Sequence, residues 1–70
     1  MSETSKFYLE RAEQSARDAA STNLSNVRDR CLRSEAAWRL MAERLERTET
    51  TRRQAMADRA ERAAATEVPA

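Results

Sequence analysis

Apolar residues recur at helical spacing through the first part of the chain. A helix over residues 5–20 would gather them on one stripe about 120° wide, the pattern of an amphipathic helix. The stripe consists of Tyr8, Leu9, Ala12, Ala16, Ala19 and Ala20, while Phe7 lies well off it. Because most of the stripe is alanine, a second helix can approach closely but covers little apolar area. Three polar residues ahead of it are competent caps: Ser2, Thr4 and Ser5.

A single polar break follows this helix. Residues 21–26 read Ser-Thr-Asn-Leu-Ser-Asn, and all but the leucine are cap or turn formers. Short connections between helices usually make the two helices antiparallel neighbours. The break therefore predicts a helical hairpin in which Asn23 or Ser25 caps the second helix, and the sequence leaves both open.

The second predicted helix carries the clearest periodic signal. It begins near residues 24–27 and meets no helix breaker before Pro69. Spacings of three and four alternate along it for about three heptads, the pattern of a coiled-coil seam. The seam consists of Leu24, Val27, Cys31, Ser34, Trp38, Met41, Leu45 and Thr48. Continued further, the same register reaches Arg52, Ala55, Arg59 and Arg62, so the apolar seam stops at Leu45.

Charged residues can keep the remaining part of this helix helical without a core. Acid-before-base pairs four residues apart each add about 0.2–0.5 kcal/mol to an isolated helix. The candidates are Glu35–Arg39, Glu43–Arg47, Glu49–Arg53 and Asp58–Arg62. The chain is thus divided into a flexible start (1–4), a hairpin (5–47), a charged helical extension (48–65) and a disordered tail (66–70).

Composition supports an all-α fold and argues against an enzyme. There is no glycine, which tight β-turns require, and helix formers dominate. With one cysteine, Cys31, and no histidine, the chain has no intramolecular disulfide and no common zinc spacing. A nucleophile would also have no conventional base. We therefore expect no catalytic residues, no metal site, no cofactor and no small-molecule substrate.

The small size of the chain points to association with another helical surface. A domain of 70 residues buries a limited fraction of its surface and commonly needs a disulfide, a metal or a partner. Only the partner remains here, either a second copy or another helical protein. The simplest arrangement is a C2 dimer that completes a four-helix bundle, so that the chain serves as a self-associating adaptor or small regulator. Its predicted interface residues are Leu24, Val27, Trp38, Met41 and Leu45.

Charge favours neither a membrane nor nucleic acid as the main partner. Thirteen basic residues stand against twelve acidic ones, and no apolar stretch is long enough to span a membrane. The start of the chain lacks the features of a secretory signal, which favours the cytoplasm. An alternative function is nucleic-acid association. It would use arginines in the second half of the long helix: Arg52, Arg53, Arg59 and Arg62. Acidic residues are interleaved there, so a solvated helix face is the preferred interpretation.

Two blocks of sequence carry a family resemblance. They are Tyr-Leu-Glu-Arg-Ala-Glu at 8–13 and Asn-Val-Arg-Asp-Arg-Cys-Leu-Arg-Ser-Glu-Ala-Ala-Trp at 26–38. Over residues 7–47 the chain resembles a group of small bacterial helical-hairpin proteins, a resemblance that implies a hairpin fold and no established activity. It also looks loosely like one tetratricopeptide helix pair, but it lacks that repeat's glycine and helix-ending proline and contains a single copy.

Overall fold

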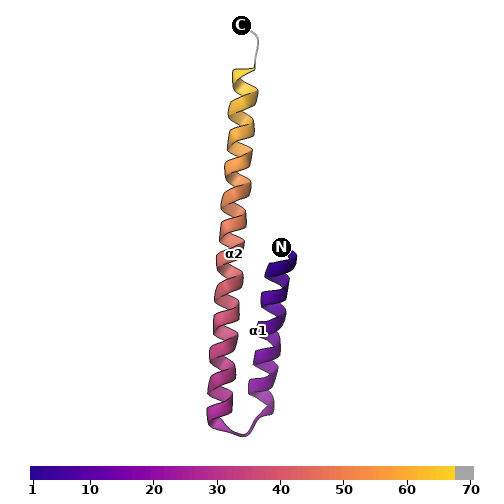
Figure 1. Ribbon diagram of the computed structural model, residues 1–70, viewed down its shortest axis with the longest axis vertical. Helices are drawn as coiled ribbons and strands as arrows, with labels where there is room; N and C mark the ends of the chain where they lie inside the picture. The colour runs from indigo at the N-terminus through magenta and orange to yellow at the C-terminus, as the bar shows by residue number, and fades with distance from the viewer. Residues whose placement is uncertain (68–70) are drawn as a thin grey trace.

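The protein folds as two antiparallel helices of very different length. The computed structural model describes residues 1–67, in which α1 spans Glu3–Ser21 and α2 spans Ser25–Thr66 (Figure 1). No strand occurs within these residues. The two helices pack against each other, so the all-α helical hairpin expected from the sequence is confirmed.

Ser2 determines where α1 begins. Its hydroxyl oxygen accepts a hydrogen bond from the backbone N–H of Ser5 at 3.1 Å, the geometry of a side-chain N-cap. Glu3 follows in the first turn, where a carboxylate interacts favourably with the helix dipole. The helix therefore starts two residues earlier than expected. Glu3 and Thr4, which were assigned to a flexible start, are helical.

The connection between the helices is held by a different residue from those expected. Thr22 accepts a hydrogen bond from the N–H of Leu24 on its hydroxyl, and its carbonyl accepts one from Arg28 at 2.9 Å. The N-cap of α2 is Leu24, whose side chain has no capping group. The prediction that Asn23 or Ser25 caps α2 is therefore wrong. Leu24 stays extended, and its own carbonyl starts the helix by accepting from the N–H of Arg28.

Small side chains form the contact between the helices. The buried residues of α1 are Ser5, Ala12 and Ala19, spaced seven residues apart, and the buried residue of α2 is Ala42. Seven residues are about two helical turns, so the three positions of α1 share one face. No large apolar side chain within residues 1–67 is fully buried. The two helices therefore lie close together, but the core between them is small.

The face of α2 toward α1 departs from the expected seam in its second half. Ala42 is buried, whereas Met41 is 37% exposed and Thr48 is also exposed. Between Cys31 and Glu49, the less exposed positions of α2 are Cys31, Ser34, Glu35, Trp38, Ala42, Leu45, Glu46 and Glu49. An α-helix has 3.6 residues per turn, so a strict 3.5-residue pattern drifts around it by about 20° per heptad. Ala42 replaces Met41 at the contact because α2 follows the helical period.

Past the start of α1, α2 continues as an unaccompanied helix (Figure 1). From Thr50 to Glu67 every residue is exposed except Asp58, which is half-buried. Thr66 is the last helical residue, so the expected tail at 66–70 begins too early, and residues 68–70 lie outside the described residues. The molecule measures 73 Å along its longest axis.

Only one of the four expected ion pairs forms among residues 1–67. Arg39 contacts Glu35 at 2.8 Å. In the extension, Asp58 instead accepts a hydrogen bond from Gln54 at 2.9 Å, and Arg53 donates to the Thr50 hydroxyl at 3.2 Å. Hydrogen bonds involving amide and hydroxyl side chains therefore form along the extension where ion pairs between charged side chains were expected.

Candidate protein interface

Three aromatic rings from the two helices meet on one side of the hairpin. Trp38 of α2 lies 5.9 Å from Phe7 and 5.8 Å from Tyr8, both of α1, measured between ring centroids. The Phe7 and Trp38 rings are at 86°, the edge-to-face arrangement that aromatic pairs favour. The guanidinium of Arg11 lies 5.6 Å from the centroid of the Trp38 ring, within cation–π range.

This cluster is open to solvent on its outer side. Trp38 and Tyr8 are half-buried, and Phe7 is 51% exposed. Met41 and Leu45 follow Trp38 at three and seven positions and extend the same side of α2. We call this surface the aromatic face; it consists of Phe7, Tyr8, Arg11, Trp38, Met41 and Leu45. Its apolar groups are not enclosed by the hairpin alone.

The structure brings together only part of the interface predicted from the sequence. Trp38, Met41 and Leu45 lie on the aromatic face, and Val27 is half-buried nearer the connection. Leu24 is 61% exposed beside the connection and is separated from Trp38 by fourteen residues of helix, or about 21 Å. Leu24 therefore does not belong to the same patch.

The predicted interface omitted three members of the aromatic face: Tyr8, which the sequence placed on the alanine-rich stripe, and Phe7 and Arg11. Phe7 was set aside because it falls off the alanine stripe of α1. The usable signal was its spacing, because Phe7 and Arg11 are four residues apart and share one side of the helix. Their contact with Trp38 arises because the α1 alanines allow α2 to come close.

On the opposite side, α1 and α2 form a shallow apolar hollow. It has a volume of about 350 Å³ and is lined by Met1, Leu9, Ala42, Glu43, Glu46 and Arg47. The Oε1 atom of Glu46 is buried there and has no hydrogen-bond partner among residues 1–67. No group of three or more histidine, cysteine, aspartate or glutamate side chains in the described part of the chain could hold a metal ion.

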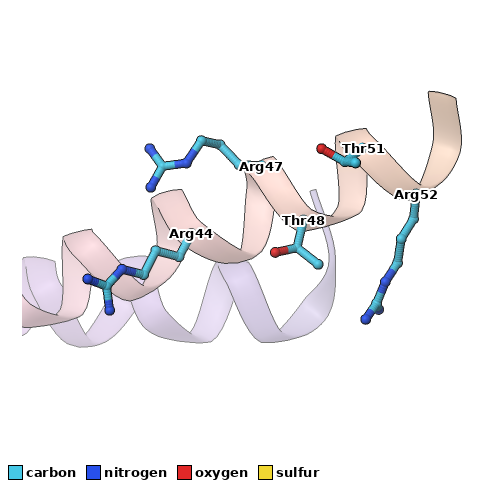
Figure 2. Close-up of a pocket in the computed structure, with 5 residues that line it drawn as sticks. All are labelled: Arg44, Arg47, Thr48, Thr51 and Arg52. Atoms are coloured by element: carbon cyan, nitrogen blue, oxygen red, sulfur yellow. The ribbon is translucent and has the colours of Figure 1, made fainter. Parts of the chain in front are cut away.

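The arginines of the alternative prediction lie on the unaccompanied part of α2. Arg52, Arg53, Arg59 and Arg62 are all exposed. A larger surface hollow, about 530 Å³, lies at the start of this region between Arg44, Arg47, Thr48, Thr51 and Arg52. Figure 2 shows these side chains spreading from different sides of one helix, with Arg47 and Thr51 on one side and Thr48 and Arg52 on the other. They do not converge on a small ligand.

Neither helix, within residues 1–67, is both long enough and apolar enough to cross a membrane. No known protein family, curated protein or solved structure matches the chain. The resemblance to bacterial helical-hairpin proteins and the cytoplasmic location therefore stay predictions. The function is therefore inferred from the surfaces of the hairpin.

Proposed function

We propose that the protein is a non-enzymatic interaction module that self-associates through its aromatic face. The supporting observation is the division of side chains by size. The buried positions are serine and alanine, while Trp38 stays partly accessible and Phe7 and Met41 are exposed. Clustered exposed apolar side chains mark interaction surfaces, and tryptophan is enriched among residues that dominate binding energy.

A second copy suits this face better than an apolar ligand does. The face is a ridge of rings on a hairpin, not an enclosed cavity, so it needs an equally extended partner surface. In a C2 dimer the same patch meets itself, and two hairpins make four helices around a shared core. Burying the exposed parts of Phe7, Trp38 and Met41 in a dimer would give the core the large apolar side chains that the core of the single hairpin lacks.

The mass of the protein in solution tests this proposal. We expect light scattering after size-exclusion chromatography to give a dimer at tens of micromolar. Phe7→Glu places a charge on the exposed side of the face and should give a monomer with unchanged helicity, because Phe7 is half exposed in the hairpin. Trp38→Ala should also weaken the dimer, and it removes ring contacts worth about 3 kcal/mol or more if they become buried.

Leu40→Ala is the matched control. Leu40 is 42% exposed, but it lies two residues from Trp38 and therefore about 160° around α2 from it. This variant should remain dimeric. A wild-type protein that is monomeric at tens of micromolar and melts cooperatively would overturn the proposal, as would Leu40→Ala dissociating as readily as Phe7→Glu.

A further inference from the structure

From Arg44 onward, one side of α2 carries arginines and no acidic residue. Six positions separated by three or four residues fall within an arc of about 80° on one side of the helix. We call them the arginine row: Arg44, Thr48, Arg52, Ala55, Arg59 and Arg62. All six are exposed. Four of them are arginines, and the other two are small.

No acidic residue falls on the arginine row. The nearest acids around the helix are Asp58, about 40° beyond one edge, and Glu49, about 60° beyond the other. None of the row's arginines has a carboxylate within 4.0 Å among residues 1–67, where the ion pair is Arg39–Glu35. The near-neutral chain therefore contains a row of arginines that have no carboxylate in direct contact among residues 1–67.

We propose that the arginine row binds the phosphate backbone of duplex DNA without reading its sequence. Arginine guanidinium groups and threonine hydroxyls are donors that proteins use for phosphate oxygens. Arg44 and Arg52 are eight residues apart, or about 12 Å along the helix. The major groove of B-form DNA is about 12 Å wide, so a helix lying across it reaches phosphates on both strands.

The same row fits a membrane or an acidic helix less well. An interfacial helix needs a broad apolar face beside its basic face, and the extension offers Met56 and scattered alanines. A partner helix would need an apolar seam to pack against, and that seam ends at Leu45. Binding to a phosphate backbone requires neither, because it is driven by neutralising phosphates and releasing their counterions.

The row keeps Arg52, Arg59 and Arg62 from the four arginines indicated by the sequence alone and differs from them in one position. Arg53 is about 100° around the helix from Arg52, and it donates to the Thr50 hydroxyl instead. Arg44 takes its place. The row lies on one helix, outside the aromatic face, so the inference does not rest on self-association and the two can fail separately.

Fluorescence anisotropy with a labelled 30-base-pair DNA duplex, titrated with the full chain at several salt concentrations, tests the inference. The wild type should bind at low salt, with affinity falling steeply as salt rises. Arg52→Gln/Arg59→Gln should weaken binding at low salt about tenfold or more. It should also reduce the slope of log affinity against log salt by about 2, since each phosphate contact contributes about 0.9.

Arg47→Gln/Arg53→Gln is the matched control, because it removes the same charge from exposed positions off the row. It should change affinity by less than threefold and leave the slope nearly unaltered. Absence of binding by the wild type at low salt would overturn the inference. So would equal losses in the two double variants, or binding to anionic vesicles or polyglutamate that is as strong as binding to the duplex.

Discussion

At the scale of single residues, the closeness of the two helices depends on side chains with at most one non-hydrogen atom beyond Cβ. Ala12 has no exposed surface, and Ser5 and Ala19 repeat the same position two turns to either side. Closely packed positions tolerate added volume poorly, because neighbours must move or adopt strained rotamers. Alanine at these sites is therefore a packing requirement, beyond its value as a helix former.

Enlarging Ala12 should separate the helices. We expect Ala12→Leu to destabilise the hairpin by about 1–3 kcal/mol through overpacking. The measurement is thermal unfolding followed by circular dichroism, where a change of 1 kcal/mol moves the midpoint by about 4–8 °C in a domain of this size. Ala20→Leu is the control, since Ala20 is on the same helix but exposed, and it should leave the midpoint within about 2 °C. An unchanged midpoint in Ala12→Leu would show that the contact is loose.

At the scale of the elements, the two halves of α2 are stabilised by different interactions. Its first half has a partner in α1, and packing supports it. Its second half has no tertiary partner in the hairpin and depends on residues that favour the helix, with side-chain hydrogen bonds such as Gln54–Asp58. The two halves should therefore respond differently to the same local damage.

Proline substitutions distinguish the two halves. Proline inside a helix removes a hydrogen bond and costs about 3 kcal/mol or more. Ala57→Pro should lower the helical signal at 222 nm but leave the unfolding midpoint reported by Trp38 fluorescence unchanged. Ala42→Pro, at the buried contact, should abolish the cooperative Trp38 transition. If Ala57→Pro also shifted the Trp38 transition, the extension would be coupled to the hairpin and not independent of it.

At the scale of the whole molecule, the hairpin and its extension make an elongated protein with two kinds of surface. The aromatic face lies where both helices are present, and the arginine row begins beside the start of α1 and runs along the extension of α2 (Figure 1). Association through the first surface would bring two copies of the second into one assembly. Stability and binding would then both depend on protein concentration.

Self-association makes the unfolding midpoint depend on concentration. Anything that binds the folded chain and not the unfolded chain stabilises it by mass action. We expect the midpoint to rise steadily over a hundredfold increase in concentration of the wild type and to stay constant in Phe7→Glu. Differential scanning fluorimetry or calorimetry at matched concentrations measures both. A wild-type midpoint independent of concentration would contradict association of the folded state.

The sequence by itself determined the fold class, the position of the break and the length of the second helix. Missing glycine, helical spacing and a cluster of turn formers are local properties, and each acts through the backbone of its own segment. The sequence also placed Trp38 on the apolar face of the second helix, because the periodic spacing of large apolar residues can be recognised without knowing the partner helix. These features do not depend on how the two helices meet.

Only the tertiary structure decided the register between the helices and the composition of the aromatic face. Ala42 is buried in place of Met41, and Phe7 reaches Trp38 from outside the apolar stripe of α1. Thr22 binds across the connection in place of the expected caps. The reason is that close contact between helices favours small side chains at positions that follow the 3.6-residue turn. The pattern of apolar residues in the sequence, in contrast, shows where large side chains occur, but not whether the partner helix leaves room for them.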